Sequence, residues 1–533
     1  MLNILHQSSP VSKKYSFLFS YKFALVIMAL IVSTISAYHA FTDPSAYREH
    51  YHGDLITELE AYTSGLNFEK HGFIQLYFLP ALHTYEEARV TQPMYTHFPP
   101  GSNVMSGVMQ KIGLHQFYSQ KKAMLILNIV ALVFFILSIR HLIPTSDHFP
   151  EIVFGVILIN SAWQIFWLGN ISLYTYSDLI TAVALWALVT NRTKIYLTMC
   201  FLAMCVNFEL VPFLGLMSWY LAINNHKKGI WNRLQSVIYV GMTGGVFFLG
   251  FALHFLQNAF YFGSVNAAYL DFQKVFMERT SIIQSDVDYS IVKHIAKIFY
   301  SSLWYYGSVV LILGIVGLRI AFKTRNWLPI CLLLAGASWQ LLFKQHAMNH
   351  AFTTRHLAIG FFILATLGFL HLWHQNQKWK KILAGVLLAG AIFRIPLGCE
   401  VSRNPLLLHQ LEQVISETDS ATVLSLLTFL KDTREHRYEK LILINELAKR
   451  HNQPIRQPVY AFKTNDTAFT LRVEPQNSKL TGRNLPPDRQ VSFYDSVNGY
   501  VDTPIQTSVP VIEILSPLNP LRYHLLRLYL LLI

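Results

Sequence analysis

The chain has 533 residues, of which 53% are hydrophobic and only 14% are charged. Soluble domains carry about 25% charged residues, so this composition excludes an ordinary soluble protein and indicates a membrane protein. The formal net charge of +13 would suit nucleic acid in a soluble chain. Here the lysines and arginines gather in short runs between apolar segments, as in cytoplasmic loops. We therefore expect membrane lipids as partners, and no nucleic acid.

About eleven segments are predicted to cross the bilayer. Runs of about 17–25 apolar residues can span its hydrocarbon core. Nine runs are predicted as single helices: 23–41, 123–139, 152–168, 179–189, 234–256, 303–322, 327–343, 357–372 and 382–397. The run 195–223 is too long for one span and is interrupted by Asn207 and Glu209. We expect it to form a hairpin of two half-depth helices.

The positive-inside rule gives these spans an orientation. With the N-terminus in the cytoplasm, the strong basic runs fall on the cytoplasmic side: 140, 192–194, 227–233, 323–325 and 378–381. Lys121 and Lys122 fall outside, which indicates either a miscount or a basic pair that meets phosphate. Four segments lie outside as well: the first outer loop 42–120, the loops 257–302 and 344–355, and the tail 399–533.

The fold class predicted is an all-α polytopic membrane protein with a small extracytoplasmic α+β domain at its C-terminus. Residues 1–398 form the membrane domain, and residues 399–533 form the polar tail. Within the tail, 406–450 has helical periodicity and 491–515 has a strand-like pattern. The four cysteines lie in or beside apolar runs without the spacing of a zinc site, so no metal site is predicted.

The first outer loop carries the catalytic candidate. Asp54 lies beyond the first predicted span and opens an amphipathic stretch. A carboxylate just outside the bilayer can act as general base toward an acceptor hydroxyl or amine. A solvated acidic residue that caps a surface helix has the same spacing, so both interpretations remain open at this point.

Small residues, a His-Gly pair and an H-x-P-P segment follow in the same loop: Ala61, Gly65, His71-Gly72 and His97-Phe98-Pro99-Pro100-Gly101. With the upstream acid, this pattern resembles the C-type glycosyltransferase (GT-C) superfamily. It is most similar to the branch of dolichyl-phosphate-mannose protein mannosyltransferases, which includes bacterial lipid A aminoarabinose transferases. The resemblance covers roughly the first 120 residues. It implies Asp54 as catalytic base and His97 as a site residue, but Leu55 stands where the family often has a second acid.

Two later segments add candidates. Glu209 is an ionisable residue at membrane depth, which by default faces a cavity or a partner, although a hydrogen-bonded helix break is an equal explanation. Arg355 opens a span at the outer mouth, where the resemblance implies contact with the lipid phosphate; a simple interfacial anchor is the alternative. His346 and His350 share a helical face and could bind a metal or make interfacial hydrogen bonds.

Loop 257–302 offers a further charged face. Asp271, Lys274, Glu278 and Arg279 have the spacing of one side of an amphipathic helix. Such a run is usually a solvated face, and a role over a lipid groove is the alternative. Asp178, just outside the fourth span, is equally ambiguous.

These observations predict a membrane glycosyltransferase. It would move a hexosyl or pentosyl group from a polyprenyl-phosphate donor to a lipid, glycan or protein acceptor, at the periplasmic face of a bacterial inner membrane. The candidate residues for binding the substrate or donor are His97, Lys121, Lys122, Glu209, His350 and Arg355. No cofactor is indicated, and a divalent metal stays an open alternative. A transporter or flippase is the first alternative, although no internal repeat is detected. A membrane scaffold whose tail binds a partner is the second.

Overall fold

The computed structural model describes a helical protein. The described residues are 55–81, 94–115, 117–143, 148–159, 161, 169–280, 290–349, 351–388, 493–495 and 499–501. Asp54, His350, the predicted span 23–41 and almost all of the predicted C-terminal domain lie outside them. From that domain two short strands are described, β1 (Phe493–Asp495) and β2 (Gly499–Val501), which pair antiparallel. They fall within the stretch predicted to be strand-like.

Helices account for nearly all of the remaining described chain. In order they are α2 (Leu55–His71), α3 (Gly101–Lys111), α4 (Phe117–Leu142), α5 (Phe149–Ile159), α7 (Leu173–Val189), α8 (Thr193–Val206), α9 (Leu210–Lys227), α10 (Arg233–Phe262), α11 (Val265–Thr280), α12 (Ile291–Tyr306), α13 (Ser308–Thr324), α14 (Trp327–Leu342), α15 (Lys344–Asn349), the 3-10 turn η4 (Ala351–Thr354) and α16 (Arg355–Trp373). A further helical stretch covers 378–388.

Several of these helices have the length and composition of membrane spans. Within the described residues, α4, α10 and α16 are long and apolar enough to cross a bilayer. A fourth span is available if the bent pair α12–α13 counts as one. The helices α5, α7, α8 and α14 are apolar but shorter. The chain is therefore a multi-pass helical membrane protein, as predicted, and the count of eleven spans stays a prediction.

The long apolar run 195–223 is broken where its polar residues predicted. α8 ends at Val206, and α9 begins at Leu210. The two helices run antiparallel, because Asn191 before α8 meets Asn225 near the end of α9, where Asn225 Nδ2 donates to Asn191 Oδ1 over 2.8 Å. A helical hairpin is present, as predicted, with residues 207–209 at its tip, and the half-depth insertion of its two helices stays a prediction.

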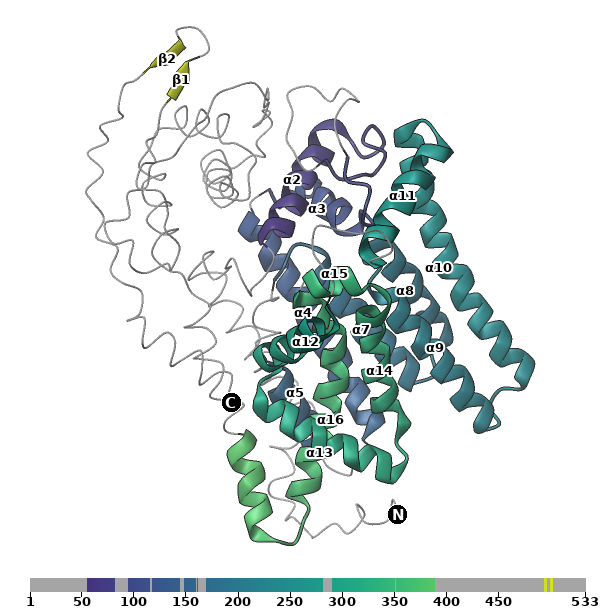
Figure 1. Ribbon diagram of the computed structural model, residues 1–533, viewed down its shortest axis with the longest axis vertical. Coiled ribbons are helices and arrows are strands. Elements are labelled where there is room, and N and C mark those ends of the chain that lie inside the picture. The colour runs from purple at the N-terminus through teal and green to yellow at the C-terminus, as the bar shows by residue number, and fades with distance from the viewer. Residues whose placement is uncertain are drawn as a thin grey trace.

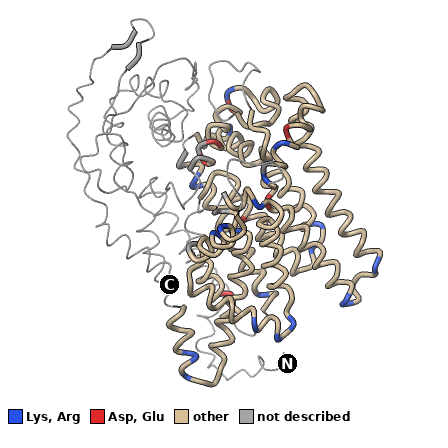
Figure 2. Tube along the Cα trace, viewed as in Figure 1, with Lys and Arg blue, Asp and Glu red and all other residues tan. Residues whose placement is uncertain are grey.

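The two ends of the bundle differ in charge. We call the end that holds 192–194, 227–233 and 323–325 the basic end, and the end that holds 207–209 and 344–355 the site end. Figure 2 shows lysines and arginines at the turns between α9 and α10 and between α13 and α14, which are the lower turns in that view. The basic runs that the sequence assigned to one side of the membrane thus lie at one end of the bundle.

Close helix packing positions the start of α16. A Cβ atom added at Gly336 of α14 would overlap the carbonyl group of His356, and Gly317 and Gly368 mark a similar approach between α13 and α16. Without glycine at these positions the backbones would have to separate, as is typical of helices packed in membranes. In Figure 1, α16 lies inside the bundle and α10 at its edge, beside α8 and α9. The first residues of α16 are thereby held against α14.

Candidate functional site

The hairpin tip places a buried carboxylate inside the site end. Asn207 adopts an extended backbone that ends α8, and its side-chain oxygen accepts from the Glu209 backbone N–H over 3.0 Å. The Asn207 amide donates to Ser177 Oγ of α7 over 3.0 Å. Glu209 is 1% exposed. The helix break is therefore hydrogen-bonded, and it also aims an ionisable group into the protein.

Two histidines, His346 of α15 and His356 of α16, lie against Glu209. His356 Nε2 is 3.2 Å from one carboxylate oxygen, and His346 Nδ1 is 3.9 Å from the other. Trp339 Nε1 donates to His346 Nδ1 over 3.2 Å, which fixes that ring against α14. A buried carboxylate is stable as an anion only when donors or cations surround it, and the His356 imidazole supplies a donor, whereas the His346 nitrogen that accepts from Trp339 does not.

Arg355 precedes His356 in the sequence, and its side chain points toward α7. Its Nη2 donates to Asp178 Oδ1 and to the Tyr174 carbonyl, both over 3.3 Å, and its guanidinium lies 4.8 Å from the centroid of the Tyr174 ring. The Arg355 side chain is 2% exposed and that of Asp178 is 16% exposed. Both side chains are thus largely buried, and Asp178 is the more exposed of the two.

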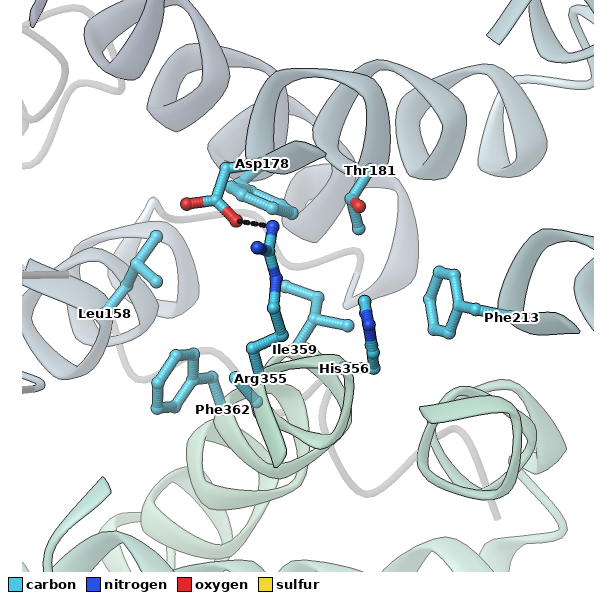
Figure 3. A pocket seen from close by; sticks show the side chains of 10 residues that line it. Leu158, Asp178, Thr181, Phe213, Arg355, His356, Ile359 and Phe362 are labelled. Atoms are coloured by element: carbon cyan, nitrogen blue, oxygen red, sulfur yellow. Dashed lines mark hydrogen bonds and ion pairs between the residues drawn. The ribbon is translucent and has the colours of Figure 1, made fainter. Parts of the chain in front are cut away.

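A pocket opens beside this pair. It is small, and Figure 3 shows Arg355 reaching Asp178 between Leu158 and Phe362 on one side and Thr181, His356 and Phe213 on the other. The lining residues are Phe135, Leu158, Asp178, Thr181, Phe213, Arg355, His356, Ala358, Ile359 and Phe362. A guanidinium set among apolar walls suits a ligand with an anionic head and a hydrocarbon body.

The H-x-P-P segment lies on the same end of the bundle, held by α11. Asp271 Oδ2 accepts from Thr96 Oγ1 over 2.7 Å, and Asp271 Oδ1 is 3.4 Å from His97 Nε2. Phe98 extends toward the first cluster, with its ring centroid 6.3 Å from those of Phe208 and His346. The predicted amphipathic helix 271–279 is confirmed as helix, and its Asp271 contacts this segment.

Lys121 forms a second buried ion pair at the site end. Its Nζ donates to both carboxylate oxygens of Glu58 over 2.9 and 3.1 Å, and the Ile171 backbone N–H donates to the same carboxylate over 2.9 Å. Glu58 is fully buried and Lys121 is 3% exposed. The exception to the positive-inside pattern therefore has a local cause, because a neighbouring carboxylate neutralises Lys121. Lys122 is exposed.

The first turns of α7 connect these clusters. Ser172 Oγ accepts from Thr57 Oγ1 of α2 over 3.2 Å, next to the Glu58 pair. Tyr174 and Asp178 contact Arg355, and Ser177 accepts from Asn207. α2, the hairpin tip and α16 thus meet at the start of α7.

The structure brings some of the predicted site residues together. Glu209 contacts His356, the neighbour of Arg355 in the sequence, and Phe98, the neighbour of His97, lies beside His346 of the same cluster. Lys121 is engaged by Glu58, and its predicted phosphate role stays a prediction, as does that of Lys122. Asp54 and His350 lie outside the described residues.

The sequence did not single out His356 as a polar partner, and it left Asp178 ambiguous. No motif marks either residue, since each acquires its partner only through the fold. Among the residues that the structure describes, no group of three or more His, Cys, Asp or Glu side chains is arranged to hold a metal.

Comparison with known proteins yields structural likenesses only. No family model and no curated protein sequence matches the chain. Among solved structures, the archaeal oligosaccharyltransferase of Archaeoglobus fulgidus, tethered to an acceptor peptide, is similar with a TM-score of 0.40 and 11% identity over 81% of this chain. The same enzyme, AglB, with an inhibitory peptide and dolichol-phosphate, gives a TM-score of 0.39 and 11% identity over 76% of this chain.

A third structure of that enzyme, with zinc and sulfate, gives a TM-score of 0.42 and 14% identity over 75% of this chain. The present chain spans 59%, 59% and 56% of the length of the three structures. At TM-scores below 0.5 we base the function on the residues of this chain.

Proposed function

We propose that this protein is a membrane glycosyltransferase that takes a sugar from a polyprenyl-phosphate donor. The observation that carries the proposal is the pocket at Arg355, where a buried guanidinium lies among apolar side chains from α4, α5, α9 and α16. A polyprenyl phosphate has the matching chemistry, an anionic head joined to a long hydrocarbon. In this proposal the enzyme is a member of the GT-C superfamily, crosses the membrane about eleven times and has a C-terminal domain that begins at residue 399.

The proposed reaction assigns one task to each group. The Asp54 carboxylate accepts the proton of the acceptor hydroxyl or amine, whose lone pair attacks the anomeric carbon of the sugar. The bond from that carbon to the phosphate oxygen breaks, and the electron pair leaves with the polyprenyl phosphate. The Arg355 guanidinium stabilises the charge that develops on the departing phosphate. Attack opposite to the leaving group inverts the anomeric configuration.

Two features of the site end support this arrangement. The guanidinium of Arg355 is oriented by Asp178 and Tyr174, so little ordering is required when an anion binds. α2, the helix that begins directly after Asp54, is held to α4 and α7 by the Glu58–Lys121 pair and by Thr57. In the proposal these contacts fix the helix that follows Asp54 at the site end, on the outer face of a bacterial inner membrane.

The test is a substitution of Asp54. A strain that lacks the protein is complemented with the wild type or with Asp54→Asn, and lipid A, membrane proteins and polysaccharides are compared by mass spectrometry. We expect one glycoconjugate to lose a sugar in the deletion strain and in the Asp54→Asn strain, at equal membrane levels of the protein. Identical glycoconjugates in all three strains would refute the enzyme.

A flippase or transporter is the alternative, favoured by one observation. The broken hairpin α8–α9 carries a buried ionisable residue at its tip, a feature of transporter binding sites. The two functions differ in vesicles: a transporter moves a lipid-linked sugar across the bilayer without changing its covalent structure. Asp54→Asn then leaves the donor chemistry unaffected, whereas it abolishes sugar transfer by the enzyme.

A further inference from the structure

The helix α12 exposes large apolar side chains on one side. Its exposed side chains include Ile291, Val292, Ile295 and Phe299, which are 64%, 73%, 61% and 61% exposed. At 100° per residue these four positions fall within an arc of about 100° on one side of the helix. A helix on a soluble protein would turn such a stripe toward the core. The stripe of these four residues faces away from the protein instead.

His294 and Lys297, on the other side of α12, face the protein; Tyr306, in the last turn, falls on the side of the stripe but is buried. His294 Nε2 is 3.1 Å from Gln340 Oε1 of α14. Lys297 Nζ donates to the carbonyl of Met348 in α15, and the Tyr306 hydroxyl donates to the carbonyl of Thr354 in η4. These polar groups of α12 thus contact the end of α14 and the segment between α14 and α16, which leads to Arg355.

These contacts also fix the direction of α12. His294, near its start, and Tyr306, at its end, both contact residues at the site end, where α14 stops and α16 begins. α12 therefore lies across the ends of these helices, and in Figure 1 it is found directly below α15. At Gly307 the chain turns by 105° into α13, with a backbone φ of 86° that favours glycine.

We propose that α12 is an interfacial helix that lies in the bilayer surface at the site end, with its four-residue stripe inserted among the acyl chains. The stripe is continuous with a lipid-facing wall, because the next helix, α13, exposes Ile312 and Ile315 by 52% and 66%. Lys293, exposed on α12, is long enough to reach headgroup phosphates while the stripe stays in lipid.

The interfacial position has a consequence for the site. α12 holds Met348 and Thr354, which flank the turn before Arg355, so the membrane surface determines the depth of the guanidinium. A group fixed at that depth meets anions at the level of the lipid phosphates. The membrane contact itself does not depend on the proposed activity, and it is tested without catalysis.

The experiment places an environment-sensitive probe on the stripe. The full chain, with its four cysteines replaced by alanine, receives one cysteine at Val292 or at Ile295, is labelled with the fluorophore NBD, and is reconstituted in phosphatidylcholine vesicles. Phe248, 70% exposed on α10, serves as the control within the membrane, and Lys228 at the basic end serves as the aqueous control. Quenching is measured with lipids that carry a nitroxide at acyl carbon 5 or 12, and with iodide in solution.

We expect the probes at Val292 and Ile295 to lose at least half of their emission to the shallow nitroxide, and less to the deep one. The probe at Phe248 follows the opposite order, and the probe at Lys228 responds to iodide alone. Strong iodide quenching at both stripe positions, without lipid quenching, would place α12 in water and overturn the proposal. Protection from both quenchers would show that protein covers the stripe, from this chain or a second copy, and would overturn it equally.

Discussion

Replacing Arg355 by methionine removes the guanidinium and keeps most of the apolar stem. It also leaves Asp178 without its cation, and the Asp178 side chain is only 16% exposed. Breaking a buried ion pair by removing one partner costs about 3–5 kcal/mol; since Asp178 keeps some contact with its surroundings, we expect about 3 kcal/mol of lost stability. The single variant alone would therefore confuse weak binding with poor folding.

The double variant Arg355→Met/Asp178→Asn separates the two effects. A neutral amide in place of the carboxylate removes the unpaired charge, so most of the lost stability should return. Binding should not return, because no cation is left in the pocket. A charge-assisted hydrogen bond to phosphate is worth about 1.5–3 kcal/mol, which corresponds to a loss of roughly 10- to 100-fold in affinity.

Two assays read these quantities. Thermal unfolding in detergent measures stability, and titration of the purified protein with undecaprenyl phosphate measures donor affinity. Arg233→Ala is the matched control, since Arg233 is exposed at the basic end. Wild-type affinity in a well-folded double variant would refute the phosphate role of Arg355. Affinity that recovers together with stability would refute it as well, because Asp178 would then be the residue that matters.

Three further predictions concern the packing that supports the site. Lys121→Met should destabilise the protein by about 3–5 kcal/mol, because it removes the lysine that pairs with the buried Glu58 carboxylate. Glu58→Gln in the same chain should restore most of the loss, and equal unfolding temperatures for the single and double variants would contradict this. Gly336→Val should lower the free energy of unfolding by about 1–3 kcal/mol, because the new side chain meets the carbonyl of His356. An unchanged unfolding temperature would show that α14 and α16 are not in backbone contact. Asp271→Ala removes the acceptor of the Thr96 hydroxyl, so residues 94–98 should take up deuterium faster, and unchanged uptake would show that α11 does not hold them.

The helical hairpin illustrates what a local pattern can predict. Apolar runs identify helices because unpaired backbone groups cannot lie in lipid, and polar residues within such a run mark its break. Asn207 and Glu209 therefore located the tip from sequence alone. The basic runs likewise identified one end of the bundle, because lysine and arginine are retained on the cytoplasmic side during insertion.

The ion pairs show the opposite case. Glu58 lies 63 residues before Lys121, and Asp178 lies 177 residues before Arg355. No spacing rule connects residues so far apart, so Lys121 was interpreted as a miscount or a phosphate contact, and Asp178 stayed ambiguous. Only helix packing shows that each has a buried partner of opposite charge.

The sequence by itself thus determined that the protein is helical, crosses the membrane repeatedly and breaks its helices at 207–209. These properties follow from transfer of apolar side chains and backbone groups into lipid, a cost that each segment meets on its own. The tertiary structure decided which charges meet: Glu209 with His356, Arg355 with Asp178, and Lys121 with Glu58. Burial forces every charge to find a partner, and the choice of partner depends on which helix ends the fold brings together.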